Sequence, residues 1–239
     1  MRLDKYLGEA GVASRSEATK LIRGRHVAVN GTVVRDPAIH IDPEAAVVTL
    51  DGESVVWRRF VYVMLNKPAG YVSATEDRGQ TVMDLLPAQF VRMGLFPCGR
   101  LDIDTLGFLL VTNDGQLGHE LLSPKHHVDK TYRFRCDPSI DAAKKEKLET
   151  GVDIGDCVTR PAALVLYEDG AGASGEITIR EGKFHQIKRM FEACGSRITY
   201  LERIRFGDVP LDDSLARGEW RYLTPEEESI LRRAAGRDA

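Results

Sequence analysis

Two carboxylates stand close together in the segment Gly99–Gly107, which reads GRLDIDTLG. Asp102 and Asp104 are two residues apart, a spacing that suits either a divalent-metal site or an exposed acidic loop. A metal-dependent hydrolase would need further carboxylates that converge on this pair, and the sequence does not reveal which these are. The residues alone therefore leave both interpretations open.

Other potential metal ligands are scattered. His126 and His127 are adjacent, and adjacent side chains rarely point the same way, so this pair is a poor metal site. The four cysteines lack CxxC spacing, which disfavours both a zinc site and a disulfide framework. The sequence predicts no metal site.

The segment Glu181–Met190, EGKFHQIKRM, combines cations with apolar residues. On a helix, Phe184, Ile187 and Phe191 would form an apolar stripe, with Lys188 one turn after Phe184. Taken alone, this pattern is typical of a surface helix with ordinary lysines.

A glycine-rich segment, Gly170–Gly175, matches the dinucleotide-binding pattern GxGxxG. That site requires a helix after the glycines, whose amino terminus holds the pyrophosphate. Here the alternating sequence Glu176–Arg180 follows, which is typical of a strand. We expect a hairpin loop and no nucleotide cofactor.

The amino-terminal residues predict a small unit of two helices and a hairpin. A helix is expected over Leu3–Glu9, and Ser14 and Glu17 form a capping-box pattern for a second helix that ends near Arg23. Asn30-Gly31 predicts a two-residue turn between short strands. The second helix would bury Ala18, Leu21 and Ile22 and expose Ser16, Lys20 and Arg23.

The rest of the chain predicts a larger α+β domain. Asp42–Phe60 is expected to end the small domain and form a linker, and Val61–Leu65 begins a buried strand. Because strands and helices do not alternate regularly, a mixed, mostly antiparallel architecture is favoured, with domains at 1–58 and 59–239. Further strands are expected at Thr131–Arg135, Ala163–Tyr167, Glu176–Arg180 and Ile198–Arg205, and helices at Gly115–Leu122, Ala142–Glu149, Lys183–Cys194 and Pro225–Ala235.

Composition and charge narrow the function classes. With 239 residues, 43% of them hydrophobic, the chain can form a core, and no apolar run is long enough to cross a membrane. The first residues lack an apolar signal-peptide region, so a cytoplasmic location is expected. Residues 1–35 contain seven Lys or Arg and three Asp or Glu, although the whole chain has a net charge of −3. A basic module on a more acidic body is indicated.

The amino-terminal motifs resemble those of the S4 RNA-binding domain. RLDKYL, the G-x-x-SR that follows, KLIRG and VAVNG occur in that family's order and spacing, over residues 2 to about 50. The resemblance implies an RNA partner, bound through phosphate contacts. The basic residues expected to bind RNA are Arg2, Lys5, Arg15, Lys20, Arg23 and Arg25.

The later motifs resemble those of the RsuA-type pseudouridine synthases. LNKPAGYVS, GRLDIDTLGFLLVTNDG, SPKHHVDKTY and EGKFHQIKRMFEACG occur in that order, and the resemblance extends from Arg2 to about Leu223. It implies an S4 domain before a pseudouridine synthase catalytic domain, with no cofactor. The HH-x-x-KTY stretch and the DIDT variant look most like the enzyme that acts on 16S ribosomal RNA.

The resemblance also implies residue roles. Asp102 would be the catalytic carboxylate, Lys188 its cationic partner and Tyr132 the aromatic residue against the target base. Arg100 would fill the gap that the extruded base leaves in the RNA. His185, Gln186 and Arg189 would also bind the substrate. The partner would be 16S RNA or the assembling small subunit, and the chain is expected to be monomeric.

Three other functions remain to be distinguished. The first is a large-subunit RNA pseudouridine synthase of the same family. A non-catalytic S4-type assembly protein would not require Asp102, Tyr132 and Lys188 together. A metal-dependent RNA hydrolase that uses Asp102 and Asp104 would lose its activity with a chelator.

Overall fold

A computed structural model describes residues 1–123, 126, 128–167 and 173–237 of the chain, which divides into two compact units. The first comprises Met1–Val61 and Met83–Phe96, and the second Tyr62–Val82 and Pro97–Ala239. The boundary between residues 58 and 59 stays a prediction of the sequence.

The helices are α1 (Leu3–Glu9), α2 (Arg15–Arg23), the 3₁₀ helix η1 (Val82–Leu85), α3 (Ala88–Arg92), α4 (Gly115–Leu122), α5 (Ala142–Thr150), α6 (Gln186–Ala193) and α7 (Pro225–Ala234). The strands are β1 (Val27–Val29), β2 (Thr32–Val33), β3 (Val48–Leu50), β4 (Glu53–Val55), β5 (Tyr62–Lys67), β6 (Phe96–Cys98), β7 (Leu106–Thr112), β8 (Lys130–Asp137), β9 (Ala163–Leu166), β10 (Ser174–Ile179), β11 (Arg197–Phe206), β12 (Val209–Pro210) and β13 (Trp220–Tyr222).

The first unit forms as its sequence predicts. Ser14 and Glu17 make both hydrogen bonds of a capping box at the start of α2. Asn30 and Gly31 have φ values of 50° and 79°, which the turn between β1 and β2 requires. The segment Asp42–Phe60, expected to end the small domain and form a linker, contains β3 and β4, which extend the sheet in the order β2-β1-β3-β4.

The basic residues of this unit differ in how they are paired. Arg2 lies 2.6 Å from the buried carboxylate of Asp4, and Arg15 lies 3.6 Å from the same group. Lys5 pairs with Glu9 at 3.5 Å. The exposed side of α2 and the residues after it carry the remaining cations of the predicted set, Lys20, Arg23 and Arg25.

The second unit is built on one mixed sheet. Its strand order is β13-β5-β7-β11-β8-β10-β9, with β12 paired to β11. The β7–β11 pair is parallel and the others along this order are antiparallel, so the expected mixed, mostly antiparallel α+β class is confirmed. All six residues of β5 are buried. Sequence analysis missed β7, which lies between β5 and β11.

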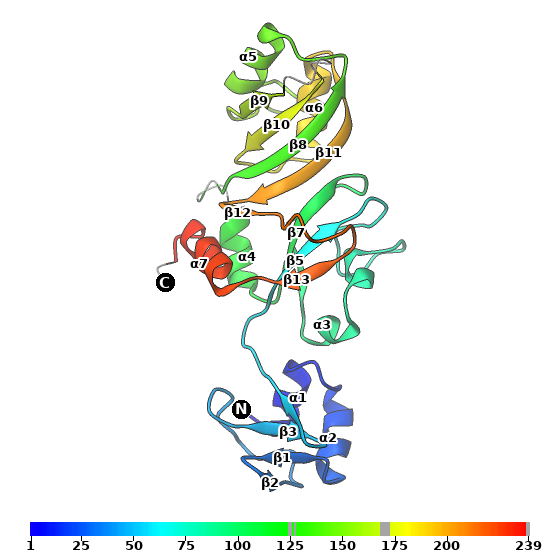
Figure 1. The fold of residues 1–239 in the computed structure, drawn as a ribbon, viewed down its shortest axis with the longest axis vertical. Coiled ribbons are helices and arrows are strands. Elements are labelled where there is room, and N and C mark those ends of the chain that lie inside the picture. Colours follow the sequence, from blue (N-terminus) through cyan, green and yellow to red (C-terminus); the bar gives the residue numbers. More distant parts are fainter. Residues whose placement is uncertain (124–125, 127, 168–172, 238–239) are drawn as a thin grey trace. The chain divides into compact units, whose positions relative to one another are not determined.

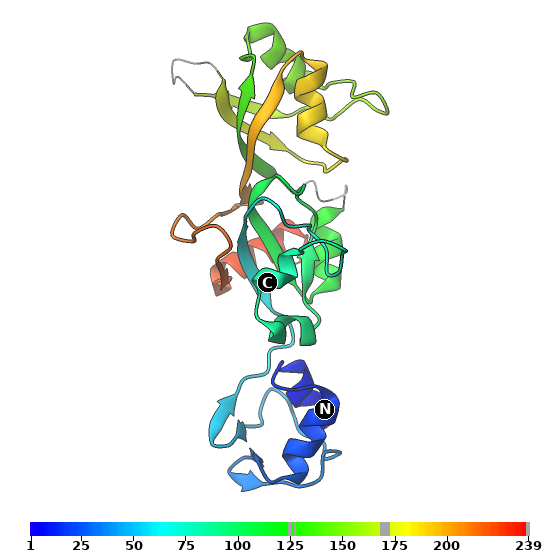
Figure 2. The same ribbon diagram turned by 90° about the vertical axis from the view of Figure 1, so that its right-hand side faces the viewer.

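Helices cover this sheet at separate places. Figure 2 shows α6 lying along β11, and the ring of Phe191 on α6 packs edge-on against Phe134 of β8, 4.8 Å between centroids. Figure 1 shows α4 and α7 side by side near β12, and Leu117, Leu121 and Leu231 of these helices belong to one buried cluster.

The other expected elements are confirmed with small shifts of their ends, except for the helix at Lys183–Cys194, which begins three residues later, at Gln186. The predicted loop at Gly170–Gly175 lies partly outside the described residues, and β10 begins at Ser174. No helix in the described part of the chain is long and apolar enough to span a membrane.

Gly107 marks a close approach of two backbones. Its φ is +95°, and a Cβ at this position would lie 2.3 Å from the carbonyl oxygen of Arg203 on the paired strand β11. Gly155 has nearly the same φ, +98°, but a Cβ there would have no described atom within 4 Å. Substitutions at the two glycines can therefore distinguish the cost of backbone strain from the cost of a steric clash.

We expect Gly107→Ala to lower the free energy of unfolding by more than about 4 kcal/mol, because β7 and β11 must separate. Gly155→Ala carries only the cost of its backbone conformation, about 1–2 kcal/mol. Urea unfolding followed by circular dichroism measures both. Equal losses would mean that the backbones separate at little cost.

Candidate active site

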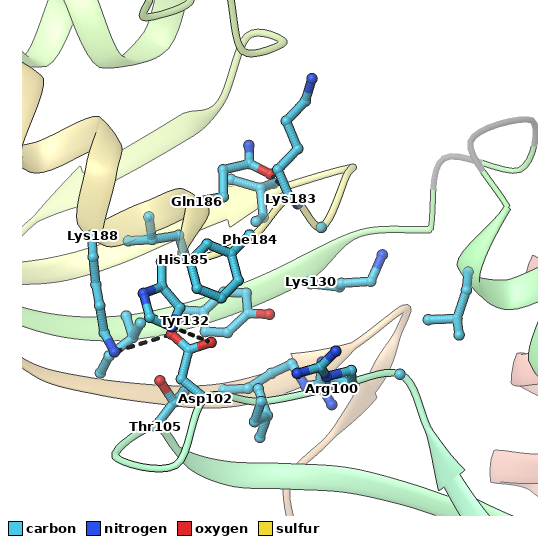
Figure 3. A pocket seen from close by; sticks show the side chains of 18 residues that line it. Arg100, Asp102, Thr105, Lys130, Tyr132, Lys183, Phe184, His185, Gln186 and Lys188 are labelled. Atoms are coloured by element: carbon cyan, nitrogen blue, oxygen red, sulfur yellow. Dashed lines mark hydrogen bonds and ion pairs between the residues drawn. The ribbon is translucent and has the colours of Figure 1, made fainter. Parts of the chain in front are cut away.

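A pocket of about 380 Å³ opens in the second unit, within the usual range of small-ligand sites. Six parts of the chain form it: the loop before β7, the end of α4, the strand β8, the end of β10, the segment that leads into α6 with its first turn, and the strand β11 (Figure 3). The predicted residues among its lining are Arg100, Asp102, Tyr132, His185, Gln186 and Lys188.

Asp102 and Lys188 form an ion pair in this pocket, as the resemblance implies. The Lys188 Nζ lies 3.0 Å from Asp102 Oδ2 and 2.5 Å from Asp104 Oδ1. His185 Nε2 lies 3.6 Å from the other oxygen of this carboxylate, Asp102 Oδ1. Asp102 is thus placed between two nitrogen groups, while Asp104 points outward with 65% of its side chain exposed.

The ion pairs shift the pKa values of Lys188 and Asp104. Partial burial opposes the charge of Lys188, but hydrogen bonds to Asp104 and Asp102 outweigh it and raise the pKa of the ammonium. At Asp104 burial also opposes the charge, but the hydrogen bond and the positive charge of Lys188, with smaller contributions from a backbone hydrogen bond and His185, together outweigh it and lower the pKa. Lys188 is therefore a permanent cation at neutral pH.

These contacts bear on the metal interpretation of the two aspartates. An ammonium already occupies the space between Asp102 and Asp104, where a shared cation would bind. Among the described residues, no group of three His, Cys, Asp or Glu side chains is arranged to hold a metal ion. The acidic pair is an anchor for Lys188.

Lys67 fixes the loop that carries Asp102. Its ammonium is completely buried and donates hydrogen bonds to the carbonyls of Asp102, Ile103 and Thr105 at 3.1, 3.3 and 3.0 Å, and to Pro68 at 3.0 Å. Burial lowers its pKa to about 8, against the opposing influence of the nearby aspartates. At pH 7 the group is still charged, and its bonds to carbonyls satisfy that charge.

Ser73 and Gly70 also hold this loop, through hydrogen bonds to the two residues that flank Asp102. Ser73 Oγ donates to the Leu101 carbonyl at 2.9 Å and accepts from the Leu101 amide at 3.1 Å. The Gly70 amide donates to the Ile103 carbonyl at 2.7 Å. The motif LNKPAGYVS thus supports the backbone on both sides of Asp102.

Tyr132 enters the pocket from the sheet. Side chains alternate along a strand, so Tyr132 lies on the same face of β8 as Phe134, the face that α6 covers. Its side chain is 7% exposed, and its neighbours across the sheet are Ile177 and Arg203. Arg100 is exposed and lines the pocket beside Asp102 (Figure 3).

The segment before α6 differs from the expected helix. Because α6 begins at Gln186 and His185 has a φ of 49°, Phe184 is outside the helix. It is 70% exposed, so the predicted apolar stripe of Phe184, Ile187 and Phe191 is wrong at its first member. Ile187 and Phe191 are buried as expected.

Gln186 and Arg189 support the pocket wall. Gln186 is 4% exposed and donates to Glu181 Oε1 at 2.7 Å, while its own Oε1 accepts from the Lys183 amide. Arg189 is absent from the described residues that line the pocket, and its guanidinium pairs with Asp156 and donates to the Ile154 carbonyl. Its predicted role in substrate binding is not supported by this placement.

Sequence reasoning missed three residues that shape the site: Lys67, Ser73 and Phe184. Lys67 and Ser73 stand in the motif LNKPAGYVS, which from sequence indicates only the family resemblance. A lysine at the end of an otherwise apolar strand is the available signal, because such a charge must find several acceptors when it is buried.

Comparisons with known proteins agree along the whole chain. The family model of RNA pseudouridylate synthase matches residues 61–193, and that of the S4 domain matches residues 1–47. The chain is 48% identical over 234 residues to the uncharacterized RNA pseudouridine synthase YtzG of Bacillus subtilis (strain 168), covering 97% of this chain and 98% of that protein.

Two further relatives bear the name ribosomal small subunit pseudouridine synthase A. That of Vibrio parahaemolyticus is 43% identical, with 95% of this chain and 97% of that protein covered, and that of Escherichia coli (strain K12) is 39% identical, with 95% and 98% covered. A solved structure titled "Crystal structure of pseudouridylate synthase" has a TM-score of 0.67 and 37% identity, and covers 97% of this chain and 99% of that one.

The support of the Asp102 loop by Lys67 can be tested by hydrogen exchange. Lys67→Met leaves buried carbonyls without a donor, so amides of residues 100–106 should exchange at least about ten-fold faster. Peptides from β8 should be unchanged. Lys147→Met is the matched control, since this exposed lysine donates to one carbonyl, that of Ala193. Unaltered exchange of the loop would show that Ser73 and Gly70 suffice to hold it.

Proposed function

The chain belongs to the RNA pseudouridylate synthase family, and we propose that it converts one uridine of the small-subunit 16S ribosomal RNA into pseudouridine. The ion pair of Asp102 and Lys188 beside Tyr132, in one pocket, is the observation that carries this proposal. The relatives that carry the small-subunit name support the choice of RNA, since they align over 95% of the chain.

We propose the assembling small subunit or its free RNA as the partner, a monomeric enzyme and a cytoplasmic location. The S4 match supports RNA binding by the first unit. A large-subunit target is less well supported, because the two relatives above, at 43% and 39% identity, are named for the small subunit. A purely RNA-binding role leaves the paired Asp102 and Lys188 unexplained.

The proposed reaction is an isomerisation. The N1–C1′ bond of a uridine breaks, the base turns, and C5 bonds to C1′, while the proton of C5 is released and N1 gains one. Because no atom is gained or lost and the oxidation state is unchanged, side chains that move protons and stabilise charge are sufficient.

Asp102 is the group proposed to act at the junction of sugar and base. A carboxylate must be ionised to serve as a nucleophile or base, and Asp102 forms an ion pair with the Lys188 ammonium 3.0 Å away. Only 27% of the Asp102 side chain is exposed, so the surrounding water that would screen this attraction is limited.

Tyr132 is proposed to stack on the extruded base, with its hydroxyl near C5. Its position on the β8 face, fixed by neighbours on both sides, gives the ring little freedom. Arg100, exposed beside the pocket, is proposed to enter the space that the base leaves in the RNA. His185 lies near Asp102 and is proposed to contact the substrate.

The proposed substrate can be identified by comparing RNA from a strain that lacks the gene with RNA from its parent. Carbodiimide treatment and primer extension over both ribosomal RNAs should show the loss of a single signal, in 16S RNA. A lost signal in 23S RNA would move the target to the large subunit. Unchanged maps of both RNAs would contradict the proposed activity.

We expect Asp102→Asn to reduce isomerisation by at least about 10³-fold, because the amide keeps the shape but cannot act as a nucleophile or base. Asp104→Asn should cost less than about ten-fold, since Asp104 is exposed and Lys188 keeps its bond to Asp102. Release of tritium from C5-labelled uridine in a 16S transcript measures both. Comparable losses would assign the two carboxylates a shared role.

The first unit is expected to anchor the RNA electrostatically. The triple variant Lys20→Ala, Arg23→Ala, Arg25→Ala should raise KM and make the slope of log affinity against log salt shallower by about 0.7 per lost phosphate contact, with kcat retained. Arg15 is left unchanged because it pairs with the buried Asp4.

A matched control for the triple variant is Lys144→Ala, Lys145→Ala, Lys147→Ala on α5, which removes the same charge from the second unit. Its salt slope should stay near that of the wild type. A collapsed kcat with an unchanged slope in the first variant would show that the basic residues orient the substrate for reaction instead of anchoring it.

A further inference from the structure

Phe184 is an exposed aromatic side chain at the pocket. It is 70% exposed, the largest exposed fraction among the large hydrophobic side chains described, and it lines the same pocket as Asp102 (Figure 3). One face of its ring lies against the imidazole of His185, with the centroids 3.9 Å apart and the planes 16° from parallel. Because the exposure is high, the rest of the ring is open to solvent.

The backbone holds Phe184 in this position. Arg189 Nη1 donates to the Phe184 carbonyl at 3.3 Å, and Gln186 accepts from the amide of Lys183 at 3.0 Å. His185 has a φ of 49°, a conformation that costs free energy for a residue with a Cβ and persists only where its surroundings impose it. The segment is therefore fixed in a shape that keeps an apolar ring in water.

The surroundings of the ring suit an RNA strand. Lys183 and Arg100 line the same pocket and supply positive charge for phosphates. His185 contacts the Phe184 ring and also lies 3.6 Å from Asp102 Oδ1, so the stacked pair begins at the carboxylate and ends in solvent. A planar group on the free face of Phe184 would continue the stack.

We propose that the Phe184–His185 pair is a stacking platform for an unpaired base that neighbours the target uridine. This rests on the proposed function, and it specifies the substrate: the uridine lies where a flanking base can leave its own stack. Aromatic platforms of this kind bind single-stranded bases with little dependence on their identity. The platform positions the strand and takes no part in bond making or breaking.

The kinetic test uses a short hairpin RNA that contains the mapped uridine. Phe184→Ala should raise KM by about five-fold to a hundred-fold, the worth of one stacked base, and leave kcat within about three-fold. Phe184→Tyr should resemble the wild type, and Phe184→Leu, which keeps apolar area without a flat ring, should resemble Phe184→Ala. Val165→Ala, at an exposed apolar residue of β9 outside the pocket lining, is the control.

Abasic RNA identifies the partner of the ring. Two hairpins are compared, one without the base on the 5′ side of the uridine and one without the base on the 3′ side. One of the two should bind the wild type as weakly as the intact hairpin binds Phe184→Ala. With that abasic hairpin, Phe184→Ala should bind no more weakly than the wild type does. Independent, additive losses on both sides would overturn the proposal, as would a fall in kcat alone.

A binding readout separates this proposal from the reaction itself. In Phe184→Trp, oligouridylate should quench the added tryptophan fluorescence beyond the signal of the wild type, which contains Trp57 and Trp220. Quenching without any mapped pseudouridine would retain the platform and overturn the proposed function. If the enzyme turns over RNA but Phe184→Trp shows no quenching and Phe184→Ala has a normal KM, the proposed function stands and the platform proposal is overturned.

Discussion

The active site depends on the burial of one ammonium group. Lys67 has no exposed surface and directs its hydrogen bonds to carbonyls of Pro68 and of the loop Asp102–Thr105. A buried charge is tolerated only when acceptors surround it, so the loop must keep the conformation that offers its carbonyls. The register of β5 with β7 pairs Lys67 with Gly107, just beyond that loop, which is why the ammonium reaches it. The carboxylate of Asp102 is in this way positioned through its own backbone, and its side chain stays available for Lys188 and for substrate.

The charges above this loop form a second, more exposed layer. Lys188 lies between Asp102 and Asp104, and hydrogen bonds to both raise its pKa in spite of partial burial. The two carboxylates are not equivalent, because Asp104 is largely in water, where an ion pair is weak. Asp104, mostly exposed, holds the ammonium at 2.5 Å, and the less exposed Asp102, at 3.0 Å, is the carboxylate proposed to act on the substrate. One cation and two carboxylates of unequal exposure are enough to set these separate roles.

Local sequence signals predicted the elements that depend on neighbouring residues. The capping box of α2 and the Asn30-Gly31 turn both follow from interactions within a few positions. The strand β7 was missed because it is apolar along its length, with no alternation, and its partner β11 is about a hundred residues away. Phe184 was misassigned for a related reason: helical spacing alone does not show that α6 begins only after His185. The roles of Lys67 and Ser73 depend on carbonyl and amide groups of a distant loop, and the sequence pattern does not identify these partners.

The site therefore divides into parts with different constraints. Tyr132 and Lys188 project from a strand and a helix that pack on one another, so their positions follow from the core. Phe184, Arg100 and Lys183 lie at exposed or half-exposed positions on the segments that border the pocket, where substitution disturbs no core. A catalytic group needs placement within a fraction of an ångström, which rigid elements provide, whereas the choice among RNA sites depends on the surface that meets the flanking nucleotides. In the function proposed above, the interior contacts of Asp102 serve the chemistry, and the border of the pocket, which includes the exposed ring of Phe184 stacked on His185, serves the choice of RNA site.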